Sequence, residues 1–315
     1  MFERLFATSA LRRLKWEEGG CPICKSEHRE LLISRDRYLQ KVDISQCSDC
    51  GHVFTSRNLS KADLAPFYKS IYRHLYENIS VVGPEYAYQS KDKLKAAYRY
   101  SQIVRTIGGF DSVVEVGSGL GYFLRECVDH GVRKVIGLEP NGVFFSFAND
   151  TLGLGGRVFN KMYESPGDVL PDANLFALFH VLEHLEDPGL LLSDIARQLG
   201  KGWLVIEVPD IENGWESLGR FNFHLGHRHY FSIETLEKLL NRSGLGVHSY
   251  ATEFDDGIYP GNMRVFVRRQ ETTSKSVVGN SPTRRKQVRE KVIRYGRTRG
   301  MRNGLLRAAF RLFKP

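Results

Sequence analysis

The spacing of apolar and polar positions changes along the 315-residue chain. Between residues 111 and 268, short apolar runs alternate with stretches of helical period, which predicts β/α units and a mostly parallel sheet. The predicted strands are 112–116, 135–138, 175–179, 203–208, 247–251 and 263–267. The last two leave no room for a long helix between them, so we expect them to pair antiparallel.

The flanking segments have other patterns. Residues 1–18 carry apolar and basic residues at helical spacing, which indicates either a helix docked on the body or a segment that touches a membrane. Residues 61–107 are predicted to be helical. They hold seven of the 14 tyrosines, namely Tyr68, Tyr72, Tyr76, Tyr86, Tyr88, Tyr98 and Tyr100. Helix packing explains most of these, although a tyrosine also offers a ligand a ring face and a hydroxyl.

The net charge of +9 is concentrated at the end of the chain. Residues 268–315 hold 15 Lys+Arg and 2 Asp+Glu, a net of +13, which leaves 30 and 34, a net of −4, for residues 1–267. We expect the basic run to be a solvated tail. Its last stretch, 301–314, has the composition of an interfacial helix attracted to anionic lipid. An unbound tail and a nucleic-acid contact are the alternatives.

Composition excludes several classes of protein. With 42% apolar residues and no uninterrupted apolar window near the roughly 18 residues of a membrane span, the sequence predicts a globular chain. Its first residues lack the features of a secretory signal. We therefore expect a cytoplasmic protein, either free or peripheral on the inner membrane face.

A glycine-rich turn follows the first predicted strand of the β/α block. Gly117, Gly119 and Gly121 stand between that strand and a predicted helix, where they let the backbone approach a ligand. Glu139 comes 18 residues after Gly121, at the end of the next strand. A carboxylate at this position is placed to accept both hydroxyls of a ribose. A dinucleotide fingerprint has the spacing Gly-x-Gly-x-x-Gly. Here the third glycine comes one residue earlier, and Glu115 stands two residues before the first glycine.

This loop resembles the S-adenosylmethionine loop of class I methyltransferases. The resemblance implies a Rossmann-like seven-stranded α/β sheet, mostly parallel with an antiparallel last hairpin. It assigns cofactor binding to Glu115, Gly117, Ser118, Gly119, Gly121, Glu139, Pro140 and His180. Residues 179–188 look like the fourth-strand motif of this family, which places His180 beside the cofactor. Glu183 and His184 would then lie near the substrate, or else be structural.

Three histidines gather in a loop after the fifth predicted strand, at His224, His227 and His229. A neutral imidazole at this edge of the sheet could take a proton from an acceptor. With the cysteines described below, the stretch is similar to zinc-containing sugar methyltransferases, whose His-Glu-His-x-x-Tyr-Phe-Ser motif is matched by His227, Tyr230, Phe231 and Ser232. Leu225 and Gly226 depart from it. Methylation of carbon, oxygen or nitrogen therefore stays open. The catalytic candidates are His227, Tyr230, His184 and Glu183.

Four of the five cysteines form two Cys-x-x-Cys pairs, Cys21/Cys24 and Cys47/Cys50, with 22 residues between the pairs. Two such pairs supply four thiolates, which fill all four positions of a tetrahedral metal site. This predicts structural Zn²⁺ in a small zinc ribbon. His28 and His52 are nearby but unnecessary. Cys127, inside a predicted helix, is expected to be a buried thiol without a role.

Together these patterns divide the chain into an N-terminal amphipathic segment (1–18), a zinc-binding module (19–60), a tyrosine-rich helical linker (61–107), a methyltransferase domain (108–269) and a basic tail (270–315). The hypothesis is an S-adenosylmethionine-dependent methyltransferase acting on a sugar, or on a polysaccharide or glycolipid precursor. The alternatives are an RNA methyltransferase and a non-catalytic adaptor that binds nucleic acid or membrane. The acidic body gives no electrostatic reason to expect a polyanionic substrate.

Overall fold

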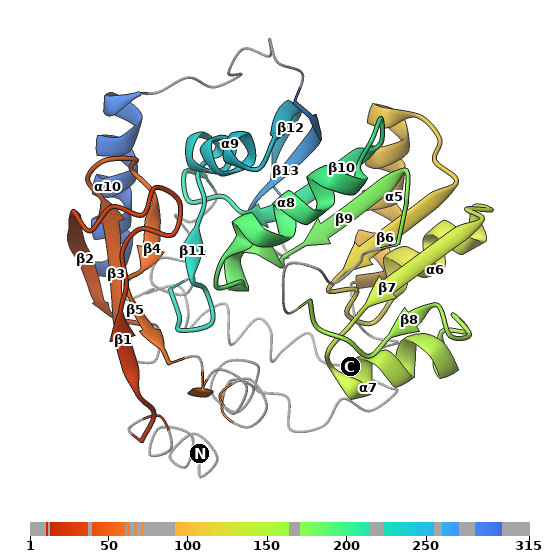
Figure 1. The fold of residues 1–315 in the computed structure, drawn as a ribbon, viewed down its shortest axis with the longest axis horizontal. Helices are drawn as coiled ribbons and strands as arrows, with labels where there is room; N and C mark the ends of the chain where they lie inside the picture. The colour runs from red at the N-terminus through yellow and green to blue at the C-terminus, as the bar shows by residue number, and fades with distance from the viewer. Residues whose placement is uncertain are drawn as a thin grey trace, which may run out of the picture.

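The computed structural model places two sheets side by side (Figure 1). It describes residues 11, 13–36, 40–60, 62, 63, 67, 71, 92–163, 171–213, 223–254, 260–270 and 281–297. One sheet has seven strands and lies within the predicted methyltransferase domain. The other is a four-stranded sheet that contains most of the N-terminal module, with a separate two-stranded ribbon beside it.

The seven-stranded sheet confirms the predicted fold class. Its strands are β6 (Ser112–Val116), β7 (Lys134–Leu138), β8 (Val158–Phe159), β9 (Leu175–Phe179), β10 (Trp203–Pro209), β12 (Leu245–Phe254) and β13 (Pro260–Arg269). Their order is β12-β13-β10-β9-β6-β7-β8. All six predicted strands are present, and the two-residue β8 is the seventh. Two residues are too few to show an alternation of apolar and polar positions, so the sequence did not predict β8.

The edge formed by β12 and β13 is antiparallel, as the short connection predicts. β13 pairs antiparallel with both β12 and β10, while β10, β9, β6, β7 and β8 run parallel to one another. The carboxyl ends of the parallel strands therefore meet at one edge of the sheet, where ligands bind in this architecture.

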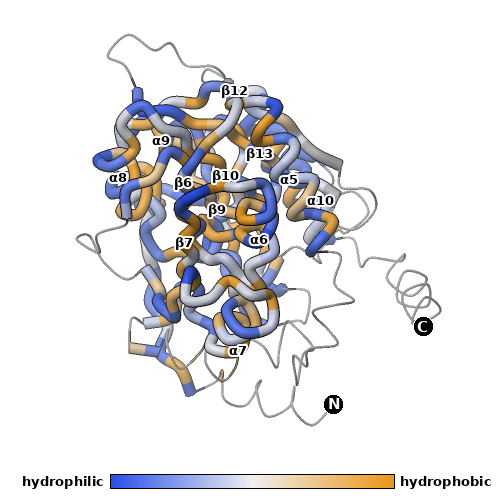
Figure 2. Tube along the Cα trace, turned by 90° about the vertical axis from the view of Figure 1, so that its right-hand side faces the viewer, coloured by the Kyte–Doolittle hydropathy of each residue, from blue (hydrophilic) through white to orange (hydrophobic). Residues whose placement is uncertain are grey.

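Helices cover both faces of this sheet. They are α5 (Asp92–Ile107), α6 (Tyr122–Asp129), α7 (Gly142–Ser146) with its π-helical extension η1 (Phe147–Thr151), α8 (Pro188–Gln198) and α9 (Ile233–Arg242). Side chains cap two of these helices: Asp187 accepts a hydrogen bond from the Gly189 N–H at the start of α8, and Ser232 and Thr235 form a capping box at α9. Figure 2 shows β9, β10 and β13 as apolar interior elements.

The N-terminal module combines segments that are far apart in sequence. Its main sheet has the order β11-β4-β3-β2, built from β2 (Arg29–Arg35), β3 (Lys41–Cys47), β4 (Val53–Thr55) and β11 (His229–Tyr230). β1 (Trp16–Glu18) and β5 (Arg57–Leu59) form the two-stranded ribbon. β11 belongs to the histidine loop of the methyltransferase domain. That loop therefore adds an edge strand to the module.

The expectation of a solvated tail is wrong for residues 282–297. They form α10 (Pro282–Arg297), which lies against the module in Figure 1 although it is the last described element of the chain. Val288, Val292 and Tyr295 are buried in the module core. The basic side chains of α10 pair with acidic residues of the body, as in Arg284 with Glu212, Arg285 with Glu234 and Arg289 with Glu30. The helical pattern was hidden because only three apolar residues face the core.

Several predictions fall on residues outside the described ones. They are the amphipathic helix within 1–10, the packing of Tyr68, Tyr72, Tyr76, Tyr86 and Tyr88, and the terminal helix at 301–314 with its proposed contact with anionic lipid. These stay predictions. Among the helices that the structure describes, none is long and apolar enough to span a membrane.

Candidate functional site

The glycine turn has the conformation that its sequence requires. Gly117, Gly119 and Gly121 have φ values of 74°, 55° and 81°, which side-chain-bearing residues rarely adopt. A Cβ on Gly117 would lie 2.6 Å from Val181 Cγ2, and one on Gly121 would lie 2.8 Å from Leu154 Cδ1. At Gly117 the turn therefore packs closely against Val181, in the segment after β9. A Cβ on Gly119, in contrast, would meet no heavy atom within 4 Å.

Glu139 fixes the open side of this turn. Its Oε2 accepts a hydrogen bond from the Gly119 N–H at 2.7 Å, and its Oε1 accepts one from the Asn141 N–H at 2.7 Å. A carboxylate oxygen can accept more than one hydrogen bond, so these two bonds are compatible with the predicted contact to a ribose. Pro140 follows on the exposed side. The predicted partner of the glycine loop thus also shapes the loop itself.

Two buried polar side chains at this turn have unsatisfied atoms. Glu115 Oε2 and Ser118 Oγ are buried and have no hydrogen-bond partner among the described residues. Burial raises the pKa of Glu115 well above its usual range, although the charge of Arg99 opposes this. Orphaned polar atoms beside a glycine turn are what a polar ligand would satisfy. Glu115, Ser118 and the glycine turn therefore offer groups that suit S-adenosylmethionine, and the assignment of all eight residues to the cofactor stays a prediction.

A charged network surrounds His180, whose φ of 56° is unusual for a residue with a side chain. His180 Nδ1 lies 3.1 Å from Glu183 Oε1, and its Nε2 lies 3.3 Å from Glu207 Oε1. Burial alone would lower the pKa of His180, but these two carboxylates raise it to about 9. The prediction places His180 beside the cofactor, and Val181 does touch the glycine turn.

Sequence reasoning missed three members of this network, Arg99, Glu207 and Arg264. Arg99 Nε donates to Glu207 Oε2 at 3.1 Å, and Arg264 donates to the same oxygen at 2.9 Å. Burial would raise the pKa of Glu207, but Arg99 and His180 hold it well below its usual range. A signal existed, because Glu207 and Arg264 each interrupt an apolar strand. Nothing in the sequence of α5 indicated that Arg99 reaches this network.

Glu183, His184 and His227, which are predicted to lie on the acceptor side of the site, come together. Each offers one atom able to ligate a metal, and these atoms lie within 4.8 Å of one another. The 3₁₀ turn η2 (Leu182–His184) carries two of them. The His184 Nδ1 donates to the Gly226 carbonyl at 2.7 Å, which holds η2 to the histidine loop. The structure therefore joins three of the four catalytic candidates into one cluster.

Tyr230, the fourth candidate, lies in the core shared by the module and the histidine loop. It is 2% exposed, and its hydroxyl donates to the His224 carbonyl at 3.3 Å. The His224 and His227 rings are in contact but tilted by 45° to each other, with centroids 3.9 Å apart. The observed role of Tyr230 is to support the loop, and a contact with the acceptor stays a prediction.

The module holds the histidine loop through several hydrogen bonds. Thr55 Oγ1 donates to the His227 carbonyl at 2.8 Å, next to the pairing of β4 with β11. The His52 and His229 rings share a hydrogen bond of 3.1 Å, and His229 Nε2 donates to the Leu185 carbonyl at 2.9 Å. Burial lowers the pKa of both rings, of His229 to about 3. The acceptor side therefore depends on the N-terminal module.

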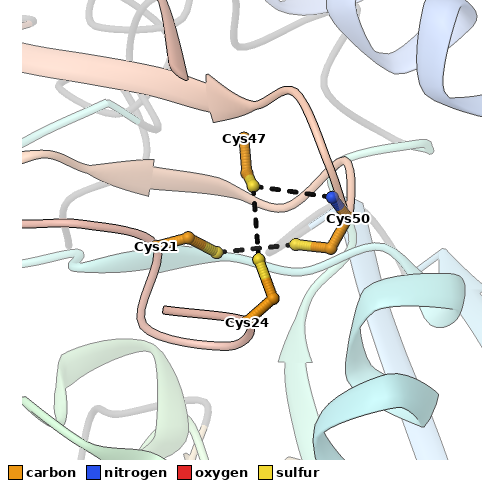
Figure 3. Close-up of side chains that lie close together, drawn as sticks. All are labelled: Cys21, Cys24, Cys47 and Cys50. Atoms are coloured by element: carbon orange, nitrogen blue, oxygen red, sulfur yellow. Dashed lines mark hydrogen bonds between the residues drawn. The ribbon is translucent and has the colours of Figure 1, made fainter. Parts of the chain in front are cut away.

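The four cysteine side chains converge on one point (Figure 3). Their Sγ atoms are 3.5 Å apart for Cys21 and Cys50, and 3.4 Å apart for Cys24 and Cys47. Tetrahedral zinc with bonds of about 2.3 Å separates sulfurs by roughly 3.8 Å, so the set fits one ion with little movement. Cys127 is buried away from this cluster in α6, as expected.

The fold defines the class as a Rossmann-like methyltransferase, and the glycine turn lies at the edge of the sheet where the cofactor is predicted to bind. A family model described as a methyltransferase domain matches residues 86–250, more than half of the chain. The chain belongs to this family and is an S-adenosylmethionine-dependent methyltransferase. No curated protein matches the chain.

Solved structures of methyltransferases are similar in fold. One is an S-adenosylmethionine-dependent methyltransferase from Mesorhizobium loti, with 18% identity, a TM-score of 0.43, and coverage of 55% of this chain and 98% of that one. Another, from Clostridium acetobutylicum, has 11% identity, a TM-score of 0.46, and coverage of 66% and 99%. The mitomycin 7-O-methyltransferase MmcR has 20% identity, a TM-score of 0.47, and coverage of 66% and 59%. These similarities carry no information about the acceptor of this chain.

Proposed function

We propose that this enzyme methylates a hydroxyl group of a sugar, or of a polysaccharide or glycolipid precursor, and that it carries a structural zinc ion in its N-terminal module. The observation that carries the proposal is the cluster of Glu183, His184 and His227 beside the glycine turn. A hydroxyl acceptor must lose a proton during methyl transfer, and this cluster offers imidazole and carboxylate groups where the proton leaves.

S-adenosylmethionine supplies the methyl group from its sulfonium sulfur. The chain's own contribution is to position the reactants and to handle the acceptor proton. Gly117, Gly119 and Glu139 shape the pocket that would hold the nucleoside. His180, held between the carboxylates of Glu183 and Glu207, contacts the cluster directly through Glu183. The cationic imidazole that its raised pKa implies at neutral pH balances the charge of Glu183 and Glu207.

The zinc part of the proposal rests on the chemistry of the four thiols. A closed set of four sulfurs leaves no open coordination position, which is typical of structural rather than catalytic sites. The ion would join the loop before β2 to the turn after β3. Lys238 Nζ donates to the Cys50 carbonyl at 3.0 Å, so the turn that carries Cys47 and Cys50 is also hydrogen-bonded to α9 of the methyltransferase domain.

A sugar-type acceptor is favoured over RNA by two features. The histidine loop matches a motif of sugar methyltransferases at His227, Tyr230, Phe231 and Ser232. In addition, part of the basic charge that suggested a polyanion is used within the protein, because Arg284, Arg285 and Arg289 pair with acidic groups. RNA binding needs a basic surface that is open to phosphates.

Transfer of a labelled methyl group onto a panel of acceptors tests this proposal. The panel holds nucleotide-linked sugars, lipid-linked sugars and unmodified RNA transcripts, and the variant Glu139→Ala serves as a control for dependence on the pocket. We expect label in at least one sugar class and none in RNA. Labelled RNA would contradict the sugar assignment and support the alternative.

A further inference from the structure

We propose that Glu183, His184 and His227 bind one divalent metal ion of the zinc or manganese type, separate from the four cysteines, and that this ion binds the acceptor oxygen. The three ligand atoms lie within 4.8 Å of one another. The inference deepens the proposed function, because the ion's part in methyl transfer rests on a hydroxyl-bearing acceptor. Metal binding itself does not depend on the identity of that acceptor.

The carboxylate of Glu183 is the first indication. The residue is 1% exposed, and its Oε1 is bound to His180 Nδ1 at 3.1 Å. Its Oε2 is also buried and has no hydrogen-bond partner among the described residues. Leaving a buried carboxylate oxygen without a hydrogen-bond partner costs folding free energy. A cation on Oε2 would remove this cost, and His180 would orient the carboxylate as outer partners of metal ligands do.

The tautomer of His184 is the second indication. Its Nδ1 lies 2.7 Å from the Gly226 carbonyl, which can only accept, so Nδ1 carries the proton. In the neutral ring Nε2 then keeps its lone pair, which is the form that ligates a metal. A backbone carbonyl on the other ring nitrogen is the usual second partner of a metal-bound histidine.

The two segments that carry the ligands are held together by the backbone. The Arg228 N–H donates to the Glu183 carbonyl at 2.7 Å, next to the bond between His184 and Gly226. The His184 and His227 rings meet edge to face, with centroids 4.9 Å apart. Ligand atoms on an ion with bonds of about 2.1 Å lie roughly 3.0–3.4 Å apart. The ligand atoms would therefore move closer together by at most about 1.4–1.8 Å to hold one ion.

The chemistry of two imidazoles and one carboxylate defines what such an ion would do. This donor set suits zinc, iron(II) or manganese and leaves positions open for an outside oxygen. A hydroxyl bound there would lose its proton to solvent water far more readily than a free one. The acceptor oxygen then bonds to the methyl carbon while the carbon–sulfur bond breaks and leaves its electron pair on sulfur. Charge balances, because the sulfonium becomes neutral as the proton leaves.

A titration with Mn²⁺ of the full-length protein that carries one zinc ion per chain, on the four cysteines, tests the site. The signal of free Mn²⁺ in electron paramagnetic resonance gives the amount bound, and manganese does not compete well for thiolates. We expect about one Mn²⁺ per chain, and at least roughly tenfold weaker binding in His184→Ala and His227→Ala. His130→Ala, at the exposed end of α6, is the matched control and should bind like the parent.

Glu183→Gln provides a second variant, since it keeps the size of the side chain but removes its charge. Calorimetric binding of S-adenosylmethionine shows that each variant is folded. If the parent binds no Mn²⁺, or His184→Ala binds it as the parent does, the metal site is wrong and His227 stays a candidate for a direct base. That failure is distinct from a wrong acceptor class, which only the methyl-transfer panel reports.

Discussion

The cofactor side and the acceptor side of the site are built in different ways. The cofactor side comes from one continuous stretch, in which β6, the glycine turn and Glu139 lie within 28 residues. The acceptor side needs η2, the histidine loop and the N-terminal module, which meet only in the folded chain. Its stability therefore depends on long-range contacts.

This difference predicts different sensitivities. Damage to the module should impair the acceptor side and leave the glycine turn able to bind the cofactor. Damage to the turn should abolish cofactor binding while the module keeps its metal. Variants that separate these two outcomes measure how far the two sides are independent.

The largest effect is expected for Cys47→Ser. Structural zinc contributes on the order of 10 kcal/mol to the folding of small modules, and Cys47 ends β3 within the buried cluster. Zinc should fall from about one per chain to near zero, with methyl transfer lost by more than about 100-fold and S-adenosylmethionine affinity kept within about tenfold. Metal analysis and calorimetry measure these quantities, and Cys127→Ala should keep its zinc. Equal loss of cofactor binding would show that the two sides are not separable.

The converse variant is Gly117→Ala, which should weaken cofactor binding by roughly 100-fold. Its Cβ would enter the space of Val181 Cγ2 at a φ that alanine avoids, at a cost of about 1–2 kcal/mol for the backbone alone. Gly108→Ala is the control, because Gly108 has a φ of 81° but no atom within 4 Å of the added Cβ. Calorimetric titration compares the two. Similar affinities in both variants would assign the effect to backbone strain alone.

Glu139→Ala should weaken S-adenosylmethionine binding by about 10–100-fold, since it removes charge-assisted bonds of about 1.5–3 kcal/mol. The loss includes the bonds that hold Gly119 and Asn141. Glu126→Ala, on α6, removes a carboxylate from outside the turn and should bind normally. Unchanged affinity in Glu139→Ala would rule out its role in the pocket.

Acid should loosen the acceptor side selectively. Burial and the nearby His229 hold the pKa of His52 well below its usual value, and burial lowers the pKa of His229 to about 3. As the pH falls below about 6.5 the unfolded chain takes up protons that the native pair does not, so the free energy of unfolding drops by at most about 1.4 kcal/mol per pH unit for each ring. Urea unfolding at pH 7 and pH 5 measures this.

In this experiment His52→Gln should show a smaller loss of stability on acidification than the parent, because one of the two titrating rings is gone. His248→Gln removes an exposed histidine and should follow the parent. An identical pH dependence in all three proteins would exclude the buried pair as the cause.

The smallest effect is expected for Thr55→Val, which removes the hydrogen bond to the His227 carbonyl. A net hydrogen bond is worth about 1 kcal/mol, so the turnover rate should fall only by roughly threefold to tenfold while cofactor affinity stays unchanged. Thr106→Val removes an exposed helix hydroxyl and is the control. Steady-state kinetics separates them, and equal rates would show that the module does not act through this bond.

Local patterns predicted the parts that local physics controls. The antiparallel pairing of β12 and β13 was correct because it follows from the short connection between two neighbouring strands. The expectation for residues 282–297 failed because the helix is mostly polar and is held by partners such as Glu30 and Glu212. β8 was missed because two residues show no period.

The same distinction applies within the site. Glu139 was found because its distance from Gly121 follows from one β/α unit. Arg99 was missed because its partner, Glu207, lies 108 residues away. His52 was set aside as unnecessary for the cysteine site, and its actual contact is with His229, 177 residues further on. Contacts between residues so far apart in sequence do not affect the local spacing of apolar and polar positions.

The sequence alone determined the class of enzyme and the order of strand, glycine turn and acidic residue, since these features depend on neighbours in the chain. Only the tertiary structure decided that the module, the histidine loop and α10 form one body, and that Glu183, His184 and His227 meet. The physical reason is that burial and charge pairing act between surfaces. Which segments contact one another is decided only when the whole chain folds.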